Sequence, residues 1–343
     1  MRHIFLTGGG TLGSVTPLLA LVEAAREQSL PVRFTWVGTR RGPEVVLVHS
    51  YTLPYHAIVT AKWRRYFDWR NFFSPFLLFF AFGQSVLLVL RLRPDVVVST
   101  GAYTSVPVAW AAWTLRIPVV LHEQDIIDGL ANRLMRPVVN RRTTVWDRPG
   151  AETIGNPSRP SILRGSRSRF FEAHPTLVGL PVIYVTGGGT GSVAINTLVA
   201  SALPKLLEHA VVIHLTGSGK RIGNTTNPRY ITIELAVEHH DLLAAADVVV
   251  TRAGMATLSD LAASHKPAIV IPLPGTQQEA NAQVIQEAEA GIVVDEATVT
   301  AESFVRLVRR TLEDKMAATA MANRLAQLIP NGTNALLDIV MTV

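Results

Sequence analysis

The chain has 343 residues, a formal net charge of +6, 48% hydrophobic and 17% charged residues, and no cysteine. This length suggests two domains, and the composition excludes a disordered, fibrous or low-complexity chain. Without cysteine there is no disulfide scaffold, thiolate zinc site or cysteine nucleophile. The ten histidines are scattered, and the pair His239-His240 lacks helical ligand spacing, so no metal site is expected. Glycine follows too soon after the start for a signal peptide, which favours a reducing cytoplasm.

Short Val- and Ile-rich runs alternate with helical stretches along the whole chain, a pattern typical of parallel sheets covered on both faces. The predicted fold class is therefore α/β, with two doubly wound units spanning residues 1–160 and 161–330. A last helix over residues 331–343 is expected to pack back on the first unit, and residues 157–180 are expected to form an exposed connection. The strands are predicted at His3–Thr7, Val32–Val37, Asp95–Ser99, Pro118–Leu121, Val182–Thr186, Ala210–Leu215, Asp247–Thr251 and Pro267–Pro272.

Each half begins with a strand that runs into a glycine loop. Phe5-Leu-Thr-Gly-Gly-Gly-Thr-Leu-Gly-Ser14 matches Tyr184-Val-Thr-Gly-Gly-Gly-Thr-Gly-Ser192. Glycines let the backbone approach a ligand closely, and the following helix offers N–H groups and a positive dipole to an anion. One such loop could be only a tight turn, but two at matching places favour a binding site for phosphate groups.

The first loop also fits the dinucleotide fingerprint, as Gly8-x-Gly10-x-x-Gly13. That fingerprint requires an acidic residue at the end of the second strand, where this chain has Arg40 and Arg41. Arginines could accept the extra phosphate of NADP, so an oxidoreductase stays a minor alternative. It does not explain the second glycine loop.

Positive charge and aromatic residues concentrate between residues 33 and 93, where nine Lys and Arg face only Glu44 and Asp68. Such a surface could bind nucleic acid or an anionic membrane. The apolar run Pro75–Leu90 favours lipid, and the strand-like run that follows it argues against a membrane span. Two interpretations remain: a helix half-sunk in the membrane interface, or a core helix that covers the sheet. The predicted membrane patch consists of Trp63, Arg64, Arg65, Trp69, Arg70, Phe72, Phe73, Phe76, Phe79 and Phe80.

Several motifs occur in one order along the chain: Gly9-Gly-Thr-Leu-Gly-Ser-Val-Thr-Pro17, Gly101-Ala-Tyr-Thr-Ser-Val-Pro107, His122-Glu-Gln-Asp125, Gly155-Asn-Pro-Ser-Arg159, Gly187-Gly-Gly-Thr-Gly191, Arg252-Ala-Gly-Met-Ala-Thr-Leu-Ser-Asp260 and Gln277-Gln-Glu-Ala-Asn281. Together they resemble the MurG family of glycosyltransferases over essentially the whole length. The resemblance implies a GT-B architecture of two facing Rossmann-like domains. It also implies inverting, metal-independent transfer of N-acetylglucosamine from its UDP donor to the undecaprenyl-linked acceptor lipid I, without a cofactor.

The resemblance places the donor on the second domain, with the diphosphate at the second glycine loop and the helix after Gly254. A carboxylate on that helix can accept protons from two ribose hydroxyls, and amides suit sugar hydroxyls because they donate and accept. The implied donor-binding residues are Arg159, Gly187, Gly188, Gly189, Thr190, Gly191, Arg252, Gly254, Thr257, Asp260, Gln277, Gln278 and Asn281. The implied acceptor-binding residues on the first domain are Gly9, Gly10, Thr11, Gly13, Tyr103 and His122.

The chain departs from the family pattern where the general base is expected. The first loop has Ser14 in place of a histidine, and Asp125 stands where the family has asparagine. Serine is no base at neutral pH without help. We therefore expect Asp125 or Glu123 to remove the acceptor proton, while Ser14 positions the pyrophosphate. In the second loop, Gly189 and Val193 replace a hydroxyl-bearing and a basic residue.

The resemblance implies a peripheral protein on the cytoplasmic face of the plasma (inner) membrane, bound to an anionic membrane surface and not to nucleic acid. Membership of a cell-wall synthesis complex is left open. Two further alternatives remain: a related transferase with another lipid-linked or carbohydrate acceptor, and a non-catalytic UDP-binding relative.

Overall fold

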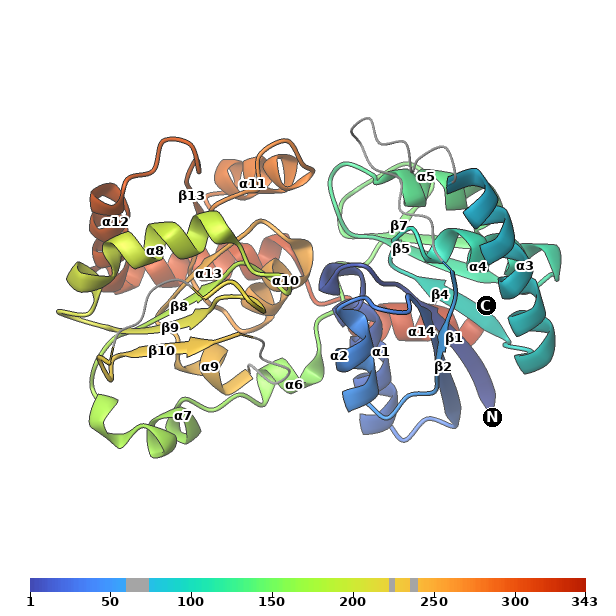
Figure 1. Cartoon of the computed structure of the whole chain (residues 1–343), viewed down its shortest axis with the longest axis horizontal. Helices are drawn as coiled ribbons and strands as arrows, with labels where there is room; N and C mark the ends of the chain where they lie inside the picture. The colour runs from blue at the N-terminus through green and yellow to red at the C-terminus, as the bar shows by residue number, and fades with distance from the viewer. Residues whose placement is uncertain (60–73, 222–225, 235–239) are drawn as a thin grey trace. The chain divides into compact units, whose positions relative to one another are not determined.

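The computed structural model describes residues 1–59, 74–221, 226–234 and 240–343. These residues form two compact units: Met1–Arg159 with Gly332–Val343, and Pro160–Asn331. The borders lie within one residue of the predicted ones. The fold is α/β throughout, and the strand pairs in both sheets are parallel (Figure 1).

The sheet of the first unit has the strand order β3-β2-β1-β4-β5-β6-β7 in the described part of the chain. Its strands are β1 (Arg2–Thr7), β2 (Val32–Gly38), β3 (Tyr55–Ala57), β4 (Val96–Ser99), β5 (Val119–Glu123), β6 (Arg141–Thr144) and β7 (Glu152–Thr153). Its helical segments are η1 (Leu12–Ser14), α1 (Thr16–Glu27), α2 (Glu44–Ser50), α3 (Ser74–Leu92), α4 (Ser105–Thr114), α5 (Leu130–Met135), η3 (Arg136–Val138) and α14 (Thr333–Thr342). The order doubles back at β1, which is the doubly wound topology that the sequence predicts.

The second sheet has the order β10-β9-β8-β11-β12-β13, with β8 at the corresponding reversal. Its strands are β8 (Val182–Thr186), β9 (Val211–Leu215), β10 (Tyr230–Ile233), β11 (Val248–Thr251), β12 (Ala268–Val270) and β13 (Ile292–Val293). Its helical segments are α6 (Pro160–Leu163), α7 (Arg167–Ala173), η4 (Pro175–Leu177), α8 (Val193–Leu206), α9 (His240–Ala245), α10 (Met255–Ala263), α11 (Gln278–Glu287), α12 (Ala301–Glu313) and α13 (Lys315–Leu328). All eight predicted strands are therefore confirmed, with ends that shift by at most two residues.

Both faces of each sheet are buried, which explains why the central strands read as continuous apolar runs. In the first unit, one core joins Phe5, Val97 and Leu121 of the sheet to α4, and α3 packs against it from outside. In the second unit, the equivalent core joins the sheet to α8 and α12.

The C-terminal helix α14 belongs to the first unit, where it packs against α1 (Figure 1). Thr333 anchors its start, because its hydroxyl donates to the carbonyl of Ser158 at 2.8 Å and accepts from the Ser158 N–H at 3.1 Å.

The connection is exposed at Arg164, Arg167 and Arg169, as predicted, and it also contains the short helices α6 and α7. Arg167 forms an ion pair with Asp247 at 3.0 Å, and Arg169 forms one with Asp241 at 2.6 Å. The sequence did not indicate these ion pairs, because the carboxylate partners lie more than 70 residues further along the chain.

Helix α3 presents apolar residues on two faces. Ala81, Ser85 and Val89 face the core and are at most 1% exposed. Phe76, Phe79 and Phe80 are 70%, 78% and 57% exposed. The interpretation as a core helix that covers the sheet is therefore confirmed for one face, and the other face offers an aromatic surface whose contact with a membrane stays a prediction. Within the described ranges, no helix combines the length and apolarity that a bilayer crossing needs. The predicted patch residues Trp63, Arg64, Arg65, Trp69, Arg70, Phe72 and Phe73 lie outside the described residues.

Candidate active site

The first glycine loop leaves β1 and is held by a buried carboxylate that sequence reasoning missed. The N–H of Gly10 donates to Glu44 Oε2 at 3.1 Å, and the other Glu44 oxygen accepts from the Thr39 N–H at 2.9 Å. Glu44 is fully buried. Burial of the Tyr55 hydroxyl raises its pKa, and the nearby Glu44 charge raises it further. Its signal in the sequence was only an acid in the first turn of a helix. Because Glu44 takes the Gly10 N–H, a pyrophosphate would depend on other groups of this loop.

Tyr103 lies against the same loop. A Cβ on Gly10 would lie 2.6 Å from Tyr103 Cε1, and Gly10 has a φ of +80°, so only glycine fits there. The fold thus brings together Gly10 and Tyr103, which the sequence analysis assigned to the acceptor. Gly9 is buried beside Glu44, while Thr11 and Gly13 are exposed.

Ser14 is 8% exposed, and its hydroxyl donates within the loop to the Thr11 carbonyl at 3.3 Å. Its own carbonyl accepts from the Thr100 hydroxyl at 2.7 Å. The loop is tied to the end of β5 because Gln124 Nε2 donates to the Gly13 carbonyl at 3.2 Å. These contacts assign Ser14 to shaping the loop.

His122 is buried in the sheet and is not exposed to bind a ligand, contrary to the prediction. It lies inside β5, not after it, and it is 0% exposed. Its ring nitrogens lie 3.0 Å from Thr143 Oγ1 and 2.8 Å from Asn156 Oδ1. Burial lowers the pKa of His122 to about 4, so the ring is neutral at pH 7 and serves the packing of the sheet.

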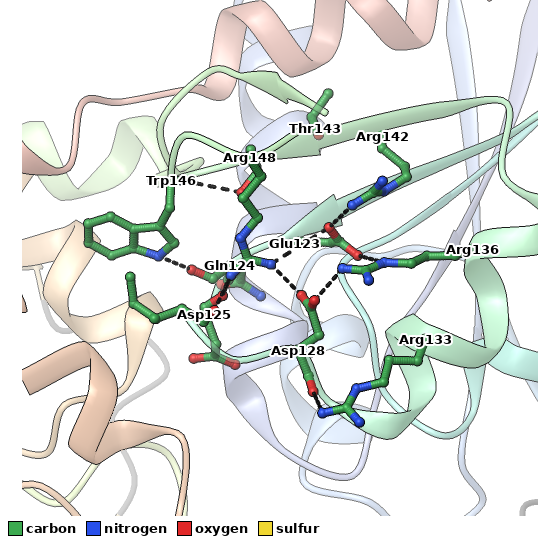
Figure 2. A network of polar contacts seen from close by, with 12 residues as sticks. Glu123, Gln124, Asp125, Asp128, Arg133, Arg136, Arg142, Thr143, Trp146 and Arg148 are labelled. Atoms are coloured by element: carbon green, nitrogen blue, oxygen red, sulfur yellow. Dashed lines mark hydrogen bonds and ion pairs between the residues drawn. The ribbon is translucent and has the colours of Figure 1, made fainter. Parts of the chain in front are cut away.

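Glu123 is the centre of an ion-pair cluster (Figure 2). It is 0% exposed, and its two carboxylate oxygens each lie 3.0 Å from a guanidinium nitrogen, one of Arg136 and the other of Arg142. Arg148 lies 3.9 Å away and also pairs with Asp128. Both carboxylate oxygens are occupied and the side chain is fully buried, so the geometry disfavours Glu123 as the base. No motif in the sequence marks Arg136, Arg142 and Arg148, and only the fold brings them together around Glu123.

Asp125, the other base candidate, is half-buried and follows β5. Arg148 donates to the backbone carbonyls of Asp125 and Ile126, and Trp146 Nε1 donates to the Gln124 carbonyl at 2.8 Å. Figure 2 shows the Asp125 side chain directed away from Arg136 and Arg142. The segment is therefore fixed through its main chain, while its carboxylate lies apart from the centre of the cluster.

The second glycine loop joins β8 to α8. Gly188 and Gly191 have φ values of +78° and +67°, and Gly189 and Thr190 are exposed. Ser192 caps α8, because its hydroxyl accepts from the Ile195 N–H at 3.3 Å. Gly187 packs on this turn so closely that a Cβ would lie 2.3 Å from the Ser192 nitrogen. The predicted strand, loop and helix are confirmed.

Arg252 is a structural link and not an exposed donor ligand, which corrects the prediction. It is 6% exposed and donates to the carbonyls of Ile271 and Pro272 at 3.1 and 3.0 Å. It also donates to Ser192 Oγ at 2.6 Å and forms an ion pair with Glu296. Its charge is compensated, and it holds three loops of the sheet edge together.

Helix α10 begins next to these loops. The residue before it is Gly254, which has no side chain to cap the first turn and has open space around it. Thr257 is half-buried in the first turn, and Asp260 lies further along, only 5% exposed. Such a helix start suits an anion.

The amide residues of α11 separate into two kinds. Gln277 and Gln278 are half-buried at the helix start, and Gln278 Oε1 accepts from the Leu273 N–H at 3.1 Å. Asn281 is 0% exposed, and its Nδ2 donates to the Ala253 carbonyl at 3.1 Å. The prediction that Asn281 contacts a sugar disagrees with this position, since its side chain joins α11 to the loop before α10.

Arg159 is the last residue before the second unit, and its role in donor binding stays a prediction. It is 6% exposed and belongs to the first unit, and its charge acts on the Tyr51 hydroxyl. Tyr51 in turn donates to Glu23 of α1. Burial, the largest cause, raises the pKa of Tyr51 to about 12. Among the residues that the structure describes, no cluster of three or more His, Asp and Glu is arranged to hold a metal ion.

Comparisons with known proteins agree with this architecture. Residues 4–144 match the glycosyltransferase family 28 N-terminal domain, and residues 182–334 match the family 28 C-terminal domain. A UDP-N-acetylglucosamine–N-acetylmuramyl-(pentapeptide) pyrophosphoryl-undecaprenol N-acetylglucosamine transferase of Lachnoclostridium phytofermentans is 34% identical over 92% of each chain. The protein of the same name from Legionella pneumophila is 35% identical over 91% of this chain and 89% of its own.

Solved structures show the same fold. MurG of Acinetobacter baumannii superposes with a TM-score of 0.73 over the whole of both chains at 22% identity. The glycosyltransferase SnogD of Streptomyces nogalater gives 0.68 at 19% identity, over 100% of this chain and 99% of its own. The two parallel-sheet domains, their paired glycine loops and these matches establish a GT-B glycosyltransferase, and the chain belongs to glycosyltransferase family 28, within its MurG group.

Proposed function

We propose that this enzyme transfers N-acetylglucosamine from UDP-N-acetylglucosamine to the muramyl 4-hydroxyl of lipid I, with inversion and without a metal ion. The observation that carries the proposal is the likeness, over about nine-tenths of the chain, to relatives named for this transfer. The two glycine loops support it, because each lies at the carboxyl edge of a parallel sheet, where α/β proteins bind ligands.

The donor diphosphate binds at the second unit in this proposal. Gly189 and Thr190 are exposed in the loop, and α10 begins just after β11, the strand that pairs with β8. N–H groups and a helix dipole stabilise the departing UDP. They take the role that a metal ion has in other transferases. Gln277 is the amide placed to contact the sugar, since Asn281 is buried.

Asp125 is the base in this proposal. The residue before it, Gln124, donates to the Gly13 carbonyl of the first glycine loop at 3.2 Å, and Glu123 is occupied by arginines. Asp125→Asn should lower the turnover number by about 10²–10⁴-fold, the usual worth of a general base, and leave the Kd of UDP unchanged. Asp147→Asn, a change of an exposed carboxylate in the neighbouring segment, is the matched control. Normal turnover in Asp125→Asn would refute this role.

We further propose that α3 docks on an anionic membrane surface on the cytoplasmic side. Phe76, Phe79 and Phe80 form an exposed aromatic surface, and Arg91 is exposed further along the helix. A helix of this kind lies in the interface with its rings among the lipid headgroups. Phe79→Ser with Phe80→Ser should reduce sedimentation with vesicles that contain phosphatidylglycerol. Val46→Ser, an exposed apolar residue of α2, is the control; equal binding by both variants would refute the surface.

The decisive assay is transfer of labelled N-acetylglucosamine to a soluble lipid I analogue in the presence of EDTA. A disaccharide product is the expected result. UDP binding without product would redirect the function to another acceptor or to a non-catalytic relative. Absence of UDP binding would overturn the donor assignment.

A further inference from the structure

A lysine that the sequence motifs do not include lies on the second glycine loop. Lys220 Nζ donates to the carbonyl of Thr190 at 2.7 Å and to that of Gly191 at 3.2 Å. An ammonium group has three N–H donors. One more hydrogen bond can therefore reach a ligand beside the loop.

The position of Lys220 follows from the contact of two loops. β8 pairs with β9, so the loop after each strand leaves the same edge of the sheet. Gly191 and Gly217 meet backbone to backbone, since a Cβ on Gly217 would lie 2.7 Å from the Gly191 Cα. Both glycines have positive φ, at +67° and +86°. Larger residues would separate the loops and remove the lysine from the carbonyls.

A buried network fixes the second of these loops from below. Asn196 Nδ2 donates to the carbonyls of Thr216 and Lys220, both at 2.9 Å, and its oxygen lies 3.0 Å from His214 Nε2. Burial lowers the pKa of His214 to about 4, so the ring is neutral at pH 7. This network holds the Lys220 backbone without adding charge to the site.

The electrostatics of the loop single out Lys220. Arg252 is neutralised by Glu296, and the exposed residue after the loop is the apolar Val193. Glu234 is the nearby acid, and it accepts from the Gly219 N–H at 3.1 Å. Among the described residues, no carboxylate lies within ion-pair distance of the Lys220 ammonium. A diphosphate next to Thr190 would therefore meet a cation that no carboxylate of the described ranges pairs with.

We propose that Lys220 binds the diphosphate of the nucleotide donor and supplies positive charge to this loop. The inference rests on the proposed function of the second unit as the donor site. Lys220 then has two tasks: it closes the loop through two carbonyls, and it offers its remaining N–H to a phosphate oxygen.

The test compares three ligands, uridine, UMP and UDP, by titration calorimetry on the full chain. Lys220→Met removes both tasks, whereas Lys220→Gln keeps an amide donor for the carbonyls and removes the charge. Lys220→Arg restores the charge. Lys205→Met is the matched control, because Lys205 is an exposed lysine in the last turn of α8.

We expect Lys220→Met and Lys220→Gln to weaken UDP binding about tenfold or more, the worth of a hydrogen bond to a charged group. Uridine binding should stay within about twofold, and the Lys220→Arg and Lys205→Met proteins should bind UDP like the parent protein. Equal weakening for uridine and UDP would reduce Lys220 to a loop-ordering residue and overturn the inference. Unchanged UDP affinity in Lys220→Gln would overturn it as well. If the parent protein fails to bind UDP, the proposed donor site itself is wrong.

Discussion

Replacement of Glu123 by glutamine tests whether its carboxylate has a structural or a catalytic role. Both Glu123 oxygens lie 3.0 Å from a guanidinium, and the side chain is fully buried. The Arg136 and Arg142 side chains are 33% and 22% exposed, so water can solvate part of their charge. Glu123→Gln keeps the shape of the residue and removes only the charge.

Breaking a buried ion pair costs about 3–5 kcal/mol, because a buried charge loses its partner. Here the partly exposed arginines and the remaining amide oxygen favour the lower end, about 3 kcal/mol. With a urea m-value of about 2 kcal/mol per M, the unfolding midpoint of the first unit should fall by about 1.5 M. Glu152→Gln is the control. It removes an ion pair between two exposed side chains, Glu152 at 51% and Arg141 at 47%, so it should cost less than about 1 kcal/mol of stability.

The chain allows this unit to be followed by itself. All six tryptophans (Trp36, Trp63, Trp69, Trp110, Trp113 and Trp146) precede residue 160, so tryptophan fluorescence reports only the first unit. We expect the Glu123→Gln protein to unfold earlier but to keep most of its transfer rate at low temperature. An unchanged midpoint together with lost transfer would refute the structural role and return Glu123 to the position of base.

Three further predictions concern residues inside the sheets and loops. Arg148→Met should lower the transfer rate about tenfold without changing the Kd of UDP, whereas Arg148→Lys should recover part of the rate. An unchanged rate would show that the Asp125 segment keeps its conformation without Arg148. Since the pKa of His122 and of His214 is about 4 in the folded chain and about 6.5 in the unfolded chain, only the unfolded state gains protons below pH 6.5. The free energy of unfolding should therefore fall by about 2 kcal/mol per histidine between pH 7 and pH 5, and it should level off near pH 4. Urea unfolding at each pH measures this fall. If the fall disappears from the second unit in His214→Gln, His214 is its source there. Asn281→Ala should destabilise the second unit by about 1–3 kcal/mol in urea unfolding followed by circular dichroism, because it leaves the Ala253 carbonyl unpaired, whereas Gln277→Ala should change donor affinity alone.

The sequence by itself determined the fold class, the eight central strands and the two glycine loops. Each of these depends on local information. A run of Val and Ile is buried on both faces wherever it lies in a parallel sheet, and a glycine loop between a strand and a helix needs no distant partner. The aromatic run of α3 was also visible, although one sequence run could not show that Ala81, Ser85 and Val89 turn inward while Phe76, Phe79 and Phe80 turn outward.

Only the tertiary structure decided which polar motif residues are exposed. His122, Asn281 and Arg252 have the same chemistry as ligand-binding residues, yet each is buried among partners that come from distant strands and loops. Conversely, Glu44 and Lys220 stand outside every motif, and folding brings each of them onto a glycine loop. A buried polar group needs its hydrogen bonds satisfied within the protein, and that requirement is met by residues far apart in the chain. Exposure and partnership are therefore properties of the packed sheets and not of the local sequence.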